Sequence, residues 1–436
     1  MTILQYKFKI IFSSNYNNSE GIIIIELNLS NIAEYLRART ELFTSEPIEV
    51  TELSSDFTGS ENEGYVNYLF RARQNGMSYV LKQARTHLRC DAIASYLPAE
   101  RNYLEYISFL LREEIAGFCV PKMLFLDKEN HVFLMEDLSR NARIMRFQLN
   151  EGVEFMNFPR QIGDFLAKSH FYTSELYLDK KIFRDLQHKF HNPYMRAIME
   201  DLVLMKSDVS LVENSRLKSI TERFWKNAEI QLAVMHVRDN FIKKSECLIH
   251  GDLHTSNIFA NLRDTKIIDM EYSFMAPYSY DLGYLLANFV SQYAAFTFRE
   301  DFFREKRKDF QQYLLDTIER VFEVYFERFK IYFEKDAKPL YKNTKGYIDS
   351  LFLDILQDSL GVMAVANMMR IINLSLFPDF DCMDGKAGNT MDTKLSAFGL
   401  SLAIDKYLLL NRKEITSPIM AVNGIKKVQR EFRGFV

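Results

Sequence analysis

The chain has few cysteines, no long apolar run and little net charge, and each deficit argues against a class of protein. The cysteines stand far apart and form no CxxC pair, which argues against a disulfide framework or a structural zinc site. They are Cys90, Cys119, Cys247 and Cys382. No uninterrupted apolar run reaches the roughly 18 residues of a membrane span. A formal net charge of −3 argues against nucleic acid as the main partner. We therefore expect a cytoplasmic protein that binds neither membrane nor nucleic acid.

The residues that are present suffice for two lobes with large cores. The 436 residues are 47% hydrophobic and 26% charged, as in ordinary globular proteins. Up to about residue 135, short β-rich runs alternate with helical ones, whereas helical periodicity dominates from about residue 159. We therefore predict an α+β fold with a β-rich N-terminal lobe, 1–137, and a mainly helical C-terminal lobe, 138–436.

Turn residues and periodicity predict the individual elements. Residues 65–73 and 77–84 are expected to form a hairpin, because Gln74-Asn75-Gly76 between them favours a tight turn. A strand is predicted over 132–135, and helices over 99–113, 159–172, 214–243, 281–295, 300–333 and 346–374. Residues 414–436 lose clear periodicity and are predicted to be loosely held.

The most informative segment is 248–281, in which two apolar runs each end in acidic residues. The first run leads into His250-Gly251-Asp252, and Asn257 follows five residues after the aspartate. The second run ends in Asp269-Met270-Glu271. Two strand ends that bring carboxylates and an amide to one point can orient a hydroxyl and hold a divalent cation. Phosphoryl transfer has that requirement, so the segment indicates a kinase.

Asp252 is the first candidate for the chemistry. We expect it to accept the proton of the acceptor hydroxyl and to orient that oxygen toward the transferred phosphate, so it also contacts the substrate. The alternative role is a loop aspartate that caps the following helical turn. The presence of Asn257 and the Asp269/Glu271 pair in the same segment favours the catalytic role.

Asp269, Glu271 and Asn257 are the candidate metal ligands. Asp269 and Glu271 stand two residues apart, so in an extended segment both carboxylates point to one side. Such a pair suits Mg²⁺, which takes a few oxygen ligands besides phosphate and water, and Asn257 can add a neutral oxygen. Without a cation the two carboxylates would repel each other, and the alternative role is an ordinary turn after a strand.

His250 and His254 lie four residues apart, a spacing that suits zinc only on a helix face. The intervening Gly-Asp-Leu does not favour a helix, and no third nitrogen or sulfur ligand is near in sequence. We expect His250 instead to bond to the backbone and hold the loop in shape.

Lys82 lies within the predicted strand 77–84, on an otherwise apolar run. It is either an exposed edge charge or a ligand of ATP phosphates held by an acid, for which Glu105 on the following helix is the candidate. Gly64 to Asn67 lead into the hairpin, where backbone N–H groups could cover phosphates. The longer segment Thr58 to Asn67 has only two glycines and is not a Walker A sequence, so its signal is weak.

Two further segments are candidates for binding. Glu136 to Leu138 connect the lobes and could offer backbone groups to an adenine edge, or form a plain connector. Arg370 could bind substrate, with its guanidinium near the catalytic loop, or contact carbonyls at the end of its helix. The sequence leaves these alternatives open.

These residues resemble those of a known family. The match covers most of the chain and includes Asn67-Tyr68-Leu69-Phe70, Leu81-Lys82-Gln83-Ala84, Met135-Glu136-Asp137-Leu138-Ser139, LIHGDLHTSNIFA from residue 248, the Asp269/Glu271 pair and Tyr280-Asp281-Leu282-Gly283. On HGDLHT followed by a DxE pair, the chain is identified as a member of the 5-methylthioribose kinase family. That family belongs to the aminoglycoside phosphotransferase and choline kinase-like group, which has a protein-kinase-like fold.

The resemblance implies a reaction and cofactors. The family transfers the γ-phosphate of ATP to the 1-hydroxyl of methylthioribose in methionine salvage, with Mg²⁺. It implies Asp252 as the base, Asp269 and Glu271 as Mg²⁺ ligands and Lys82 at the ATP phosphates. Residues 136–138 would receive adenine and Gly64 to Asn67 would cover the phosphates. The partner is a small-molecule substrate, and a homodimer is among the implied states because family members form dimers.

Several residues on the acceptor side depart from the family pattern. Tyr96 stands where the family has tryptophan, Met369 replaces one of two arginines, and Leu376 replaces a histidine. A lost arginine removes a charge-assisted bond worth about 1.5–3 kcal/mol, which is enough to change the acceptor. We expect a methylthioribose kinase, with a same-fold kinase of another sugar, amino alcohol or aminoglycoside as the alternative. A non-catalytic nucleotide-binding scaffold is the other alternative, disfavoured because the catalytic residue types are all present.

Overall fold

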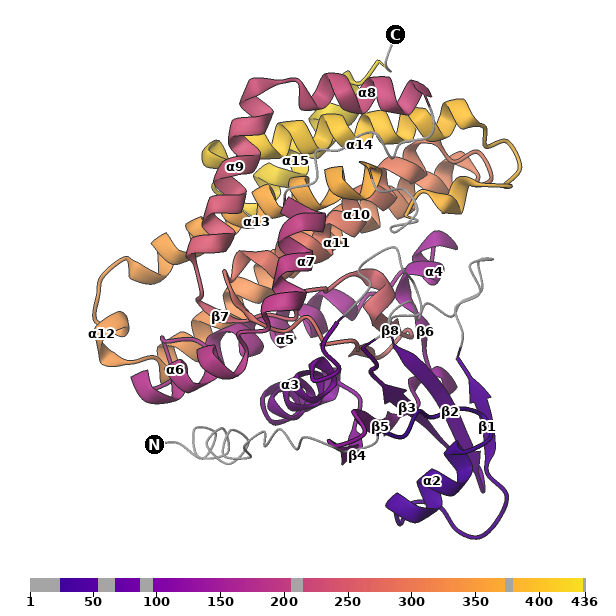
Figure 1. Ribbon diagram of the computed structural model, residues 1–436. Coiled ribbons are helices and arrows are strands. Elements are labelled where there is room, and N and C mark those ends of the chain that lie inside the picture. Colours follow the sequence, from indigo (N-terminus) through magenta and orange to yellow (C-terminus); the bar gives the residue numbers. More distant parts are fainter. Residues whose placement is uncertain (1–23, 54–66, 87–96, 205–214, 373–378, 434–436) are drawn as a thin grey trace.

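The computed structural model describes residues 24–53, 67–86, 97–204, 215–372 and 379–433. They form a smaller lobe around a β-sheet and a larger lobe of helices that lie side by side (Figure 1). The predicted α+β fold of two lobes is confirmed. No helix among the described residues is long and apolar enough to span a membrane. The division at 137/138 stays a prediction.

The smaller lobe is a five-stranded antiparallel sheet flanked by two helices. The strand order is β1-β2-β3-β5-β4. The strands are β1 (Glu49–Glu52), β2 (Tyr68–Gln74), β3 (Met77–Gln83), β4 (Met123–Asp127) and β5 (Val132–Glu136), and the helices are α2 (Ile32–Arg39) and α3 (Arg101–Ala116). Side chains alternate along β5: Leu134 belongs to the apolar core with Leu36 of α2, whereas Phe133 contacts Phe109 of α3. The sheet therefore buries both of its faces, and α3 lies on the face toward the larger lobe (Figure 1).

The predicted hairpin is confirmed over its described part. Gln74 pairs with Met77, and the turn residues Asn75 and Gly76 have φ of 51° and 76°. Both values lie in the left-handed region that a two-residue hairpin turn of this hand requires.

The larger lobe contains most of the helices and two small sheets. The helices are α4 (Met145–Asn150), α5 (Phe158–Tyr172), α6 (Lys180–Lys189), α7 (Pro193–Leu204), α8 (Ser215–Trp225), α9 (Ala228–Lys243), α10 (Ser279–Phe298), α11 (Arg304–Asp336), α12 (Pro339–Lys342), α13 (Tyr347–Ile372), α14 (Met391–Asn411) and α15 (Pro418–Glu431). The sheets are β6 (Arg143–Ile144) with β8 (Ile258–Ala260) and β9 (Thr265–Ile267), and β7 (Cys247–Leu248) with β10 (Met275–Ala276). Helix α10 is buried on nearly every side, and α11, α13 and α14 pack around it.

Two sequence predictions about helices are wrong. The helix predicted over 214–243 is broken before α9, because the Asn227 side chain accepts hydrogen bonds from the N–H groups of Glu229 and Ile230 and starts a new helix. The end of the chain is not loosely held through 414–436, because α15 packs against α11 and α14. Its apolar residues Val422 and Ile425 are fully buried.

Candidate active site

The His250-Gly251-Asp252 turn follows the buried strand β7 and requires glycine at its centre. Gly251 has φ of +89°, and a Cβ atom there would lie 2.2 Å from the carbonyl oxygen of Tyr272. Any larger residue would therefore displace the segment that follows Asp269-Met270-Glu271.

A buried carboxylate at the start of α10 holds this turn by accepting hydrogen bonds from its backbone. Asp281 accepts the backbone N–H of His250 at 2.7 Å and that of Gly251 at 3.1 Å. Burial alone would raise the pKa of Asp281, but the hydrogen bond from His170 and the backbone donors lower it below its ordinary value. The charged form of Asp281 therefore anchors the backbone next to Asp252.

The His250 side chain joins the turn to the strand that precedes Asp269. Its Nδ1 accepts the N–H of Asp252 at 3.2 Å, and its Nε2 lies 2.9 Å from the carbonyl oxygen of Ile268. The first contact leaves the proton on Nε2, which donates to Ile268. The predicted backbone role of His250 is confirmed.

Asp252 lies at a partly open position, with its side chain 16% exposed. Asn257 Nδ2 donates to the carbonyl oxygen of Asp252 at 3.0 Å and lies 3.4 Å from its Oδ2. Burial would raise the pKa of Asp252, but His254, then His250 and the hydroxyl of Tyr284, lower it below the ordinary value. Asp252 is therefore ionised at neutral pH, as a general base must be.

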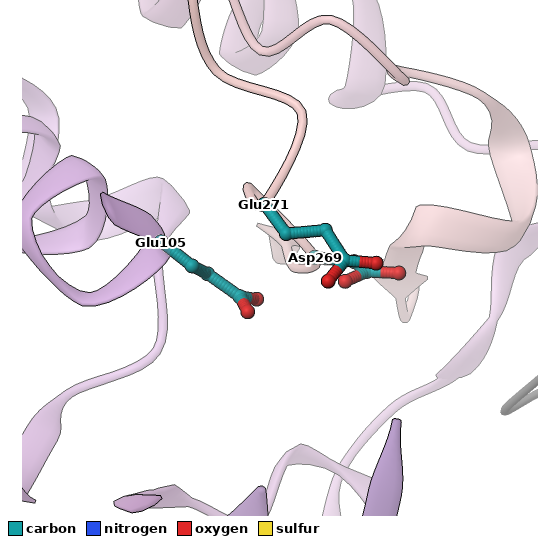
Figure 2. A group of neighbouring side chains, drawn as sticks. All are labelled: Glu105, Asp269 and Glu271. Carbon is teal, nitrogen blue, oxygen red and sulfur yellow. The ribbon is translucent and has the colours of Figure 1, made fainter. Parts of the chain in front are cut away.

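Three carboxylates from the two lobes meet beside the turn. Single oxygens of Glu105, Asp269 and Glu271 lie within 4.8 Å of one another, with Glu105 reaching from α3 and the other two from the segment after β9 (Figure 2). The backbone carbonyl of Asn257 accepts the N–H of Ile268 at 3.0 Å, which holds the Asn257 segment beside this one. The predicted carboxylate pair therefore converges, and Glu105 joins it.

The prediction that an extended segment places the carboxylates of Asp269 and Glu271 on one side is wrong. The segment from Asp269 to Glu271 is not extended, because Asp269 has φ of 62° in the left-handed region. Aspartate tolerates this conformation better than most residues. A turn, rather than strand alternation, brings the two carboxylates together.

Lys82 links two of the three carboxylates, those of Glu105 and Asp269. Its Nζ lies 2.8 Å from Glu105 Oε2 and also forms an ion pair with Asp269 Oδ1. Burial would lower the pKa of Lys82, but Asp269, Glu105 and Glu271 outweigh it and raise the pKa. The predicted contact with Glu105 is confirmed, and the alternative of an exposed edge charge is wrong because Lys82 is 4% exposed.

Arg101 completes the cluster and was not predicted. Its Nε donates to Glu271 Oε2 at 3.0 Å, and its Nη2 donates to Asn67 Oδ1 at 2.8 Å. Asn67 Nδ2 in turn donates to Glu271 Oε2 at 2.9 Å, so the described end of the predicted phosphate loop holds a carboxylate of the other lobe. The sequence did hold a signal for Arg101, because it stands four residues before Glu105 and therefore lies on the same face of the helix.

The other predicted site residues are not part of this cluster or lie outside the described residues. Glu136 is exposed and accepts the N–H of Lys122 at 3.1 Å, while Leu138 is buried. Asp137 between them bonds to Arg71 and Ser78. Gly64, Tyr96 and Leu376 lie outside the described residues, as does the side chain of Arg370.

The fold and the site together define a class of protein. A buried lysine–glutamate pair, an ionised loop aspartate and a carboxylate cluster between two lobes are the parts of an enzyme that transfers phosphoryl groups. A family model described as "Phosphotransferase enzyme family" matches residues 62–315. The chain belongs to this family.

Individual proteins resemble the chain over most of its length. A methylthioribose kinase of Bacillus velezensis is 28% identical over 358 residues, which span 81% of this chain and 86% of that protein. A methylthioribose kinase of Exiguobacterium sibiricum is 29% identical over 350 residues, 79% of this chain and 85% of that protein. Among solved structures, a choline/ethanolamine kinase family protein from Mesorhizobium loti overlays with a TM-score of 0.42 and 14% identity, covering 91% of this chain and 99% of that one. The chain is a small-molecule kinase that transfers phosphate to a hydroxyl group, and its family implies the use of ATP.

Proposed function

We propose that the protein is an ATP- and Mg²⁺-dependent kinase that phosphorylates the 1-hydroxyl of 5-methylthioribose. The observation that carries the reaction is the cluster in which Lys82 joins Glu105 and Asp269 beside the Asp252 turn. Support for the acceptor comes from the two relatives named methylthioribose kinase, which align with about four fifths of this chain.

Asp252 would act on the acceptor hydroxyl. The hydroxyl proton passes to the carboxylate while the hydroxyl oxygen forms a bond to the γ-phosphorus of ATP, and the bond from that phosphorus to the β,γ-bridging oxygen breaks. ADP leaves with the electron pair of that bond. The lowered pKa of Asp252 keeps its carboxylate ionised and able to orient the hydroxyl.

The donor set fits a hard divalent cation. Asp269 and Glu271 supply carboxylate oxygens, the ligand type that Mg²⁺ prefers, and ion pairs with Lys82 and Arg101 hold these two side chains in place. Asp269, Glu271 and Asn257 would hold Mg²⁺, which when bound neutralises phosphate charge. Lys82 would contact the ATP phosphates while Glu105 holds its ammonium group in place. Gly64 to Asn67 and the backbone of Glu136 to Leu138 would contact the phosphates and adenine.

One observation favours a second acceptor. Met369 is 2% exposed in α13, so an apolar side chain packs where the resembling family has an arginine. Of the two arginines that the resembling family has here, this chain would keep only Arg370 as a substrate-binding cation. A kinase of another hydroxylated small molecule, such as a sugar, an amino alcohol or an aminoglycoside, is therefore the alternative.

ADP release by the purified protein with Mg-ATP tests the acceptor. Methylthioribose is compared with ribose, choline, homoserine and aminoglycosides at matched concentrations. Fast turnover with methylthioribose alone supports the proposal, whereas faster turnover with another acceptor replaces it. ATP binding without turnover on any acceptor would instead favour the non-catalytic scaffold.

A further inference from the structure

His254 contacts Asp252 and has no role in the reaction as described so far. Its Nε2 lies 3.4 Å from Asp252 Oδ2, and its Nδ1 accepts the backbone N–H of Ser256 at 3.2 Å. The side chains of His254 and Asp252 are each 16% exposed, so the contact is partly shielded from solvent.

The contact with Ser256 decides which nitrogen of His254 carries the proton. Because Nδ1 accepts a hydrogen bond, the proton of the neutral ring is on Nε2, the nitrogen that faces Asp252. His254 is therefore a donor to the carboxylate and cannot take a proton from it at that nitrogen. A proton relay through His254 is excluded by this arrangement.

His254 and Asn257 approach the same oxygen of the carboxylate. Asn257 Nδ2 also lies 3.4 Å from Asp252 Oδ2. Two N–H groups that face one oxygen, together with the Tyr284 hydroxyl that also bonds to the carboxylate, restrict its rotation about the Cβ–Cγ bond. The other oxygen, Oδ1, then keeps one orientation relative to the turn.

We propose that His254 is a positioning residue for the phosphoryl transfer, holding Asp252 Oδ2 so that Oδ1 receives the proton of the acceptor hydroxyl. This inference rests on the proposed function, because it needs Asp252 to be the base. The other titratable groups around Asp252 are His250, Tyr284 and Tyr272. His250 bonds to the backbone on both sides of its ring, so it cannot replace His254 at Oδ2.

Two substitutions separate this role from a structural one. His254→Asn places an amide oxygen where Nδ1 lies, which keeps the bond to Ser256 but removes the donor to Asp252. His254→Gln places an amide N–H where Nε2 lies, which keeps the donor to Asp252 but removes the bond to Ser256. His236→Asn, at an exposed position on α9, is the matched control.

The measurements are kcat, KM for ATP and the pH profile of kcat/KM for each variant with the best acceptor. We expect His254→Asn to lower kcat by about 10-fold or more, part of the roughly 10²–10⁴-fold that a positioned base contributes, with KM for ATP unchanged. Its acidic limb should move to higher pH, because the carboxylate has lost the neighbour that most lowers its pKa. His254→Gln should keep kcat within a few fold of the wild type.

Asp252→Ala in the same assay separates the two proposals. If it abolishes turnover while His254→Asn has wild-type kcat and pH profile, the role of His254 is wrong and that of Asp252 stands. If Asp252→Ala keeps turnover, Asp252 is not the base and the inference about His254 fails with it, whereas the proposed function is tested by wild-type turnover on the acceptor panel. A loss of kcat of about 10-fold or more with His254→Gln would show that His254 only shapes the turn, and this test does not depend on whether His254→Asn folds.

Discussion

Arg101 Nε and Glu271 Oε2 form an ion pair of 3.0 Å whose two side chains are each only 2% exposed. Arg101 belongs to α3 of the sheet lobe, whereas Glu271 lies 170 residues later, beside the His250-Gly251-Asp252 turn. Asn192, at the start of α7, donates to the backbone carbonyl of Glu271 at 2.8 Å. Glu271 is thereby held from both lobes, so the metal-binding geometry proposed above depends on how the lobes meet.

Arg101→Met should destabilise the protein by about 3–5 kcal/mol, because it leaves the Glu271 carboxylate buried without its cation. Urea unfolding measures the change, and Arg184→Met at an exposed position is the control. The double variant Arg101→Met/Glu271→Leu should recover part of the loss, since no uncompensated charge remains. Equal losses for Arg101→Met and Arg184→Met would contradict a structural role for the pair.

Asp252→Ala should lower kcat by about 10²–10⁴-fold or more, because it removes the carboxylate that orients the acceptor hydroxyl. Equilibrium titration should give a dissociation constant for ATP close to that of the wild type. Asp264→Ala, at an exposed position in the same region, should keep wild-type turnover. Retained turnover in Asp252→Ala would remove the residue from its role as base.

Glu271→Gln should raise the Mg²⁺ concentration for half-maximal activity by about 10-fold. The amide oxygen can still accept the hydrogen bonds of Arg101 and Asn67, so the side chain keeps its place while a charged metal ligand is lost, and urea unfolding measures the cost of the lost ion pair. Activity is measured against Mg²⁺ at saturating ATP, with exposed Glu334→Gln as the control. An unchanged metal requirement would contradict the assignment of Glu271 as a ligand.

Asp281→Asn should destabilise the protein by about 1–3 kcal/mol near neutral pH, because the amide cannot accept from His170, His250 and Gly251 together. The folded-state pKa of Asp281 lies below its value of 3.8 in the unfolded chain. Its contribution is therefore fully present above about pH 4–5 and is lost as the pH falls through the folded pKa. The difference in unfolding free energy from the wild type should shrink on acidification, and the control Asp309→Asn should show no such trend.

Ile425→Ala should cost about 2–5 kcal/mol, because Ile425 is fully buried where α15 packs into the helical lobe. Ile419 on the same helix is 43% exposed, so Ile419→Ala is a matched control with a much smaller expected loss. Thermal or urea unfolding compares the two. Equal and small losses would mean that α15 adds little to the stability of the lobe.

Local sequence signals predicted many of the elements and the position of the candidate site. Asn75-Gly76 marked the hairpin, because these residues adopt the left-handed conformation that its turn needs. His250-Gly251-Asp252 and Asp269-Met270-Glu271 marked the site, because each motif ends an apolar run. The helix α15 was missed, since its stability comes from packing against α11 and α14, which are distant along the chain.

The sequence by itself determined the residue types that the chemistry needs and the order of the elements that present them, because both depend on neighbours along the chain. The tertiary structure alone decided that Arg101 and Asn67 hold Glu271, that a left-handed turn at Asp269 gathers the carboxylates, and that His254 Nε2 lies beside Asp252. The contacts of Glu271 join segments as far as 204 residues apart, which no local pattern of residues encodes. The conformations of the two turns depend in the same way on the segments packed against them.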